Sequence, residues 1–136
     1  MRVFLDANVI VAAVSSRGLC ADVLRETLSR HVLIASEDLL GEVRKVLRDK
    51  FGVPAEIVNE VVAWLRESAH PAEPARTMDL PLKDRADRGL VSAAIEARAD
   101  LFVTGDREIL GLERRGRTEI VSPREFWERV RGRAPK

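Results

Sequence analysis

Four acidic residues occupy positions that a purely structural role explains poorly. They are Asp6, Glu42, Asp87 and Asp106. Asp6 directly follows the apolar run "RVFL" at residues 2–5, and Asp106 follows "LFVTG" at residues 101–105. Short apolar runs of this kind are typical of buried strands, and the carboxyl ends of parallel strands meet at one edge of a sheet. We therefore expect Asp6 and Asp106 to lie at the same edge.

The other two acids interrupt apolar helix faces. Glu42 comes three residues after Leu39 and four before Val46, so it lies on the apolar stripe of its predicted helix. Asp87 comes three residues before Leu90 and repeats the pattern in a later helix. Both carboxylates should therefore point toward the protein interior near the start of their helices.

Four converging carboxylates would repel one another strongly. Two unit charges 4 Å apart repel by about 4 kcal/mol at an effective dielectric near 20, and buried carboxylates need a partner or a metal. A divalent cation removes this conflict. Oxygen-only ligands favour Mg²⁺ or Mn²⁺ over Zn²⁺, and such ions activate water and neutralise charge at a phosphate. The pattern favours metal-assisted phosphoryl chemistry.

Each acid also has a structural explanation. Asp6 and Asp106 could cap the helices that follow them, and Asp87 could form a capping pair with Asp84. Glu42 could pair with an arginine of a neighbouring helix. Each explanation is as good as the functional one for a single residue. Four acids near one sheet edge favour the metal site.

Polar residues around this edge are candidates for supporting roles. Asn8 and Thr104 could orient the carboxylates or a metal-bound water, or could make ordinary turn hydrogen bonds. Four arginines could reach phosphates from the rim, although solvated surface is the more common role for each: Arg17, Arg85, Arg88 and Arg107.

The elements that position these residues alternate between strand and helix. Strands are predicted at residues 2–5, 31–35, 100–104 and 118–121, and helices at 7–16, 20–30, 37–50, 54–68, 85–98, 107–110 and 123–132. The proline-containing segment 70–84 should be a loop or edge segment that could hold a short strand. This order predicts an α/β fold with a mostly parallel sheet covered on both faces, in one domain over residues 1–136.

Composition excludes several classes of protein. No apolar run reaches the roughly 18 residues of a membrane span. The N-terminal stretch resembles a signal peptide, but Asp6 and Asn8 interrupt it and cleavage would remove the first strand, so we reject that interpretation. The single cysteine, Cys20, excludes an internal disulfide and indicates a reducing compartment such as the cytoplasm. His31 and His70 have no ligand-like spacing.

The net charge gives little indication of whether the protein binds nucleic acid. The net charge is +1, from 23 basic and 22 acidic residues. Arginines gather in the last 25 residues, where they could face phosphates, although a solvated helix face is the favoured interpretation. We expect affinity for RNA to be modest and sensitive to salt.

Three segments resemble the PIN-domain family. They are "VFLDANVIVAAV" at 3–14, "LIASEDLLGEVRKVL" at 33–47 and "DRADRGLVSAAIEARADLFVTGDREIL" at 84–110. They look closest to the small single-domain ribonuclease toxins of toxin–antitoxin pairs. The order and spacing of the acidic blocks make the resemblance specific, and "VTGD" preceded by "ARADLF" is its most telling part.

The resemblance implies a three-layer α/β/α sandwich with a central parallel sheet. Asp6, Glu42, Asp87 and Asp106 match the acidic site of the family, with Asp6, Asp87 and Asp106 holding Mg²⁺ or Mn²⁺ directly or through water. It also implies cleavage of single-stranded RNA, a homodimer and an antitoxin partner. Ala7 stands where many relatives have Thr, which puts one hydroxyl contact in doubt.

Three other classes of protein share some of these features. An aspartyl phosphatase usually carries a second Asp two residues after the first, where this chain has Asn8. A phospho-acceptor receiver domain has a Lys after its last strand, where Ser122 and Pro123 stand here. A PIN-like interaction module without activity stays open, although retention of all four acids argues against it.

Overall fold

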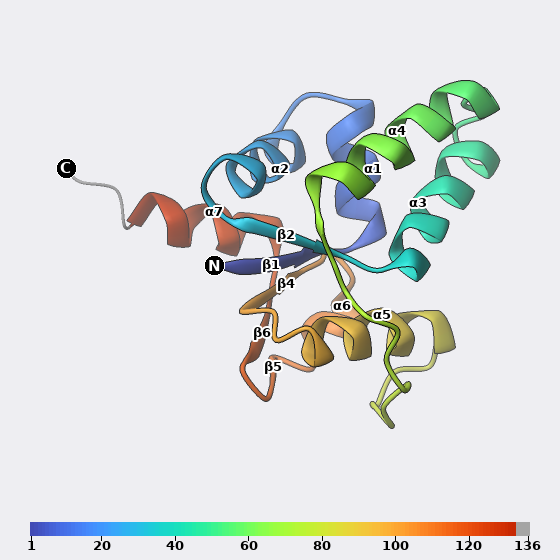
Figure 1. Cartoon of the computed structure of the whole chain (residues 1–136). Helices are drawn as coiled ribbons and strands as arrows, with labels where there is room; N and C mark the ends of the chain where they lie inside the picture. The colour runs from blue at the N-terminus through green and yellow to red at the C-terminus, as the bar shows by residue number, and fades with distance from the viewer. Residues whose placement is uncertain (133–136) are drawn as a thin grey trace.

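A mostly parallel sheet forms the centre of the protein in the computed structural model, which describes residues 1–132 (Figure 1). Residues 133–136, the end of the expected single domain, lie outside the described residues. The described strands lie in the order β3-β2-β1-β4-β6-β5, and only β5 is antiparallel to its neighbour. Their bounds are β1 (Arg2–Leu5), β2 (Val32–Ala35), β3 (His70–Pro71), β4 (Leu101–Val103), β5 (Arg114–Arg115) and β6 (Thr118–Val121).

Helices cover both faces of this sheet. They are α1 (Ala7–Ser15), α2 (Leu19–Arg30), α3 (Glu37–Asp49), α4 (Ala55–Ser68), α5 (Arg85–Glu96), α6 (Arg107–Leu110) and α7 (Pro123–Gly132). In Figure 1, α1 to α4 lie over one face and α5 and α6 over the other, while α7 packs against α2. The predicted three-layer α/β/α sandwich is confirmed.

Buried apolar strands hold the layers together. Phe4 of β1 and Phe102 of β4 are fully buried and stack with their ring centroids 5.3 Å apart. Such an aromatic pair contributes more than its buried area alone. The two strands that carry the N-terminal and the "VTGD" motifs are therefore fixed side by side.

Local signals in the sequence explain α3. The Ser36 side chain accepts a hydrogen bond from the Leu39 N–H at 3.1 Å, which caps the first turn. Glu37 and Asp38 follow in that turn, where negative charge is favourable near the positive end of the helix dipole. Gly52 ends the segment with φ +60°, a conformation that glycine adopts without strain.

The strand order reverses beside β1. The chain runs from β1 outward to β2 and β3, then returns to β4 on the other side of β1. The Asp6 N–H donates to the Val103 carbonyl at 2.9 Å, so the carboxyl ends of β1 and β4 are joined. Ligands of open α/β sheets bind in the crevice at such a reversal.

The sheet also holds strands that periodicity indicates weakly or not at all. The short strand expected in segment 70–84 is β3, which pairs in parallel with β2 at the sheet edge. β5 was not predicted, because two exposed arginines show no apolar pattern. It pairs with β6 through a tight turn at Gly116, whose φ is +60°.

The apolar N-terminal helices belong to the core. Val9 and Ile10 of α1 and Val23 of α2 are buried. Within the described part of the chain, no single helix has the length and apolar character to cross a membrane. Only α1 and α2 taken together meet that test by length and composition, and they are bent by 103° at their break.

Candidate functional site

Asp6 is the most deeply placed acid at the reversal point. It is 6% exposed and caps α1 by accepting the Ala7 N–H at 2.8 Å. Its other carboxylate oxygen accepts the Thr104 hydroxyl at 2.7 Å. Burial raises the pKa of Asp6, and the charges of Asp106 and Glu42 raise it further against the lowering effect of these hydrogen bonds. Its charge is therefore stabilised only in part.

Thr104 joins the first strand to the loop after β4. It is fully buried, and its oxygen accepts the Asp106 N–H at 3.0 Å while its hydroxyl donates to Asp6. The exposed Asp106 in turn caps α6 by accepting the N–H groups of Glu108 and Ile109 at 2.8 and 3.2 Å. One hydroxyl thus sets the relative position of two carboxylates that are 100 residues apart in the chain.

Asp87 comes to the same place from the start of α5. Asp84 caps this helix and accepts the Asp87 N–H at 3.2 Å. The Asp87 side chain is half-buried and accepts no hydrogen bond within residues 1–132. Burial first, and then the charges of Asp84, Asp6, Asp106 and Glu108, raise the pKa of Asp87 to about 6.

Glu42 reaches the cluster from α3. It is half-buried beside the buried Val43, and its carboxylate has no hydrogen bond or ion pair among the described residues. Its charge contributes to the raised pKa of Asp6. The structure therefore brings Asp6, Asp87 and Asp106 within electrostatic reach of one another, and brings Glu42 within reach of Asp6.

The donor set suits a hard divalent cation. No basic side chain in the described range pairs with any of the four carboxylates, so no cation of the protein offsets the like charges that contribute to the raised pKa values of Asp6 and Asp87. Within residues 1–132, however, no group of three His, Cys, Asp or Glu side chains is close enough to hold an ion by itself. Mg²⁺ usually keeps several waters and takes one or two carboxylates together with substrate phosphates. The residues fit an ion of that kind, held partly through water.

The predicted supporting and phosphate-binding residues differ in their surroundings. Asn8 is exposed rather than buried behind the carboxylates. Arg17, Arg85 and Arg107 are exposed and form no ion pair among the described residues. Arg88 is different, because its guanidinium donates to the carbonyls of Leu82 and of Lys83, the latter at 3.2 Å. Arg88 therefore holds the loop before α5 through Nη1, and its contact with phosphate stays a prediction.

Sequence reasoning missed Glu108. Its carboxylate accepts the Lys83 N–H at 3.2 Å and so links α6 to the loop before α5. It also contributes to the raised pKa of Asp87. An acid in the first turn of a short helix is an ordinary partner of the helix dipole, so no local signal sets it apart.

The C-terminal arginines are largely engaged with acids. Arg129 forms two hydrogen bonds with Glu119, at 2.9 and 2.7 Å, and Arg114 pairs with the same carboxylate. Arg117 pairs with Asp100. Arg133 and Lys136 of this segment lie outside the described residues. These pairs favour a structural role for much of the basic segment.

Comparison with known proteins agrees with this arrangement. The family model of the PIN domain matches residues 2–108, which include all four acids. A search of curated proteins finds no match. PIN domains are typically nucleases that bind nucleic acid and generally use divalent metal ions. Because the match covers most of the sequence, the chain belongs to the PIN domain family.

Proposed function

We propose that this protein is an endoribonuclease that cleaves single-stranded RNA with Mg²⁺ or Mn²⁺. The observation that carries the proposal is the cluster of Asp6, Glu42, Asp87 and Asp106. Asp106 and Glu42 raise the pKa of Asp6, Asp6 and Asp106 raise that of Asp87, and no basic side chain among the described residues pairs with any of the four. Family membership supports nuclease activity in general. The choice of RNA rests on the resemblance of the motifs to ribonuclease toxins.

The four carboxylates have different roles in the proposed reaction. Asp6, Asp87 and Asp106 hold the ion, directly or through water. Thr104 positions Asp6 and Asp106 through its two hydrogen bonds. When bound, the ion neutralises charge at the scissile phosphate and favours ionisation of water. Glu42 orients the attacking water and accepts its proton. The water oxygen bonds to phosphorus, the ester bond to the leaving oxygen breaks, and that oxygen takes up a proton.

We extend the proposal to the biological role that the resemblance implies. The protein would act in the cytoplasm as the toxin of a toxin–antitoxin pair, as a homodimer restrained by a small antitoxin protein. A single small α/β unit with the acidic site near one edge of its sheet is compatible with this role. The composition of complexes purified with the protein would test it.

A second candidate is a PIN-like interaction module without activity. The observation in its favour is that Asp6, Asp84 and Asp106 each cap a helix. Capping alone leaves Asp87 and Glu42 unexplained, since neither carboxylate has a hydrogen-bond partner among residues 1–132. The nuclease is therefore the better explanation of the whole cluster.

The wild-type protein should cleave single-stranded RNA in Mg²⁺ or Mn²⁺ and should lose this activity in EDTA. Excess metal added after EDTA should restore it, because the carboxylates are unchanged. The measurement is the rate of cleavage of a labelled oligoribonucleotide, with single-stranded DNA and duplex RNA of the same sequence as comparisons. Cleavage that persists in chelator would contradict the proposal.

Replacing Thr104 by Val should slow cleavage by about 10- to 100-fold, the usual effect of removing a group that orients metal ligands. The change keeps the shape of the side chain but leaves Asp6 and the Asp106 N–H without their shared partner. The buried site should also lose about 1–3 kcal/mol of stability. Cleavage rates and urea unfolding of Thr104→Val and Thr104→Ser would be compared. Thr104→Ser keeps the hydroxyl and should retain most activity.

A further inference from the structure

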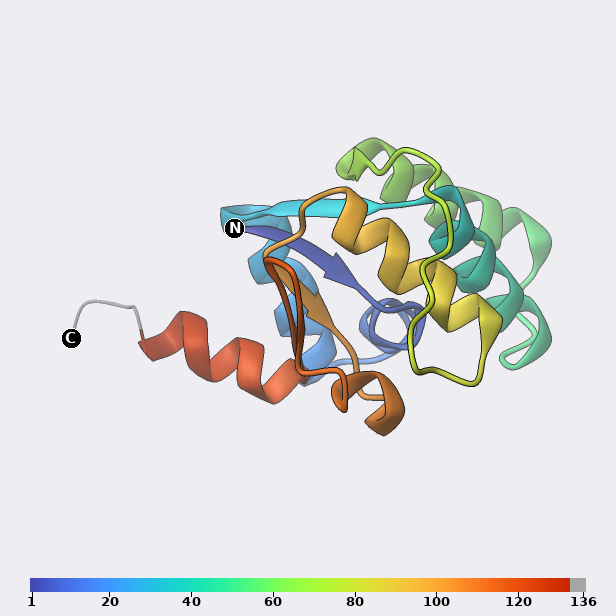
Figure 2. The same cartoon turned by 90° about the horizontal axis from the view of Figure 1, so that it is seen from below.

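A cleft of about 600 Å³ separates α3 from α5 and begins at the proposed active site, because Glu42 is one of its lining residues. A second hollow shares Glu37, Asp38, Thr77 and Gly89 with it and is also lined by the loop that follows β3. In Figure 2 this loop, in yellow-green, runs alongside α5. Because they share these lining residues, the two adjoining hollows are here called together the α3–α5 trench.

Glycines stand on both walls of the trench. Gly41 lies within α3 and Gly89 within α5, and both line the cleft. A Cβ added at either position would meet nothing within 4 Å. Glycine weakens a helix relative to alanine, and packing does not demand glycine here. Because both glycines lack a side chain, the trench is wider at these two positions.

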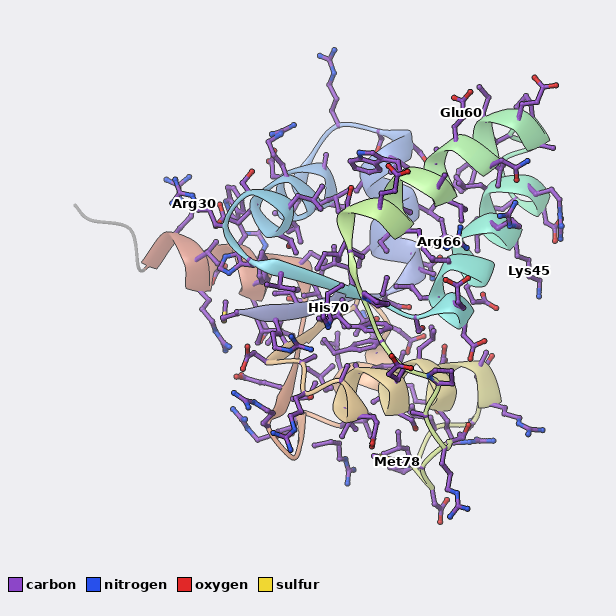
Figure 3. The ribbon with its side chains drawn as sticks, in the orientation of Figure 1. Arg30, Lys45, Glu60, Arg66, His70 and Met78 are labelled. Carbon is purple, nitrogen blue, oxygen red and sulfur yellow. The ribbon has the colours of Figure 1, made fainter. Side chains whose placement is uncertain are left out.

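The polar groups of the trench are suited to a nucleotide. Arg85 lines it, is exposed and has no ion pair among the described residues, so it can meet a phosphate. The Asp38 carboxylate accepts no hydrogen bond from the described residues. Glu37 beside it is held by Arg66 of α4, labelled in Figure 3, through contacts of 2.8 and 3.0 Å. An unpaired carboxylate repels phosphate but accepts hydrogen bonds from the amino group of a base.

We propose that the α3–α5 trench binds the base of a nucleotide next to the scissile phosphate, and prefers bases that carry an exocyclic amino group. This inference rests on the proposed nuclease function. Gly41 and Gly89 leave room for the flat base, Asp38 accepts from its amino group, and Arg85 meets the adjoining phosphate. The shared Glu42 places this base beside the bond that is cleaved.

Filling the trench tests the inference. Gly41→Leu and Gly89→Leu should raise the KM for a short single-stranded oligoribonucleotide by about tenfold, because the leucine side chain would occupy the space proposed for the base. Gly132→Leu is the matched control. A Cβ added at Gly132 would also meet nothing within 4 Å, but Gly132 lies in α7, away from the trench. Its KM and kcat should equal those of the wild type. Melting curves of all variants show whether the fold is intact.

Smaller substitutions cover the case in which a leucine variant unfolds. Gly41→Ala and Gly89→Ala should melt about 3 °C higher than the wild type, because helix propensity improves. They should still raise KM by a few-fold. An unchanged KM in both alanine variants, with intact folds, would overturn the trench inference. Failure of the wild type to cleave any RNA would instead overturn the proposed function.

Base composition provides a second, independent readout. The wild type should cleave oligo(A) and oligo(C) with a lower KM than oligo(U), since uracil lacks an exocyclic amino group. Asp38→Ala should remove this difference while Gly132→Leu retains it. Equal KM values for the three oligonucleotides in the wild type would exclude the proposed contact with Asp38.

Discussion

Asp87→Asn should lower the rate of RNA cleavage by at least about a hundredfold and leave the fold intact. Asp87 is proposed to bind the ion, and an amide oxygen is a much weaker ligand for Mg²⁺ than a carboxylate. Its side chain accepts no hydrogen bond within residues 1–132, so the substitution removes charge without breaking a structural contact. Single-turnover cleavage in Mn²⁺ and circular dichroism would measure the two effects.

Controls separate charge from structure. Asp22→Asn is matched in chemistry, and Asp22 is a partly exposed residue of α2 that pairs with Arg25 at 3.2 Å. It should cleave RNA at the wild-type rate. Asp6→Asn should be as inactive as Asp87→Asn, but it also disturbs the hydrogen bond from Thr104. Full activity in both Asp6→Asn and Asp87→Asn would end the proposal of a carboxylate metal site.

The position of Asp6 and Asp106 was predictable because it depends on short-range order. Each follows a buried strand, and the alternation of strands and helices implies a parallel sheet whose carboxyl ends share an edge. The mutual closeness of Asp6 and Asp106 also depends on β1 and β4 being neighbours. The sequence indicates strand order only through the family resemblance.

Glu42 and Asp87 were identified because each is a charged residue on an otherwise apolar helix face. A charged residue on an apolar helix stripe is costly unless something compensates it, so such a residue is informative before any fold is known. In the structure both side chains are half-buried at the cluster rather than fully buried. The stripe indicated which direction each side chain faces, and the packing of α3 and α5 determined how far it is covered.

The supporting contacts were beyond sequence reasoning. The bond between Thr104 and Asp6 and the bond between Glu108 and Lys83 join loops that meet only in the folded chain. The hydrogen bonds from Arg88 to the carbonyls of Leu82 and Lys83, on the loop before α5, were likewise not predicted. These contacts depend on distances between side chains, which spacing along a chain does not encode.

In the metal-free protein, Asp87 should make stability fall as pH rises from about 4 to about 6. The native pKa of about 6 lies above the ordinary value of 3.8, so the native state binds more protons than the unfolded state in this window. Below the ordinary value the carboxyl is protonated in both states and carries no penalty, whereas the penalty of ionising it in the folded protein grows through this window and is complete above about pH 6. Asp87→Asn lacks it. In EDTA the variant should therefore equal the wild type near pH 4 and exceed it near pH 7.5 by about 1–2 kcal/mol, since solvent screens a half-buried carboxylate.

Bound metal should make the wild type more stable than Asp87→Asn. At a concentration of Mn²⁺ one hundred times its dissociation constant, the wild type should gain about 2.7 kcal/mol from linkage, and Asp87→Asn should gain much less. Thermal melting of both proteins, in EDTA and in Mn²⁺ at several pH values, measures the crossing. The comparison also separates the two candidate functions, because helix caps made by Asp6 and Asp106 require no cation. A difference in stability between Asp87→Asn and the wild type that is the same at every pH, and the same with and without Mn²⁺, would mean that Asp87 binds no cation. The interaction module would then be the better description of the protein.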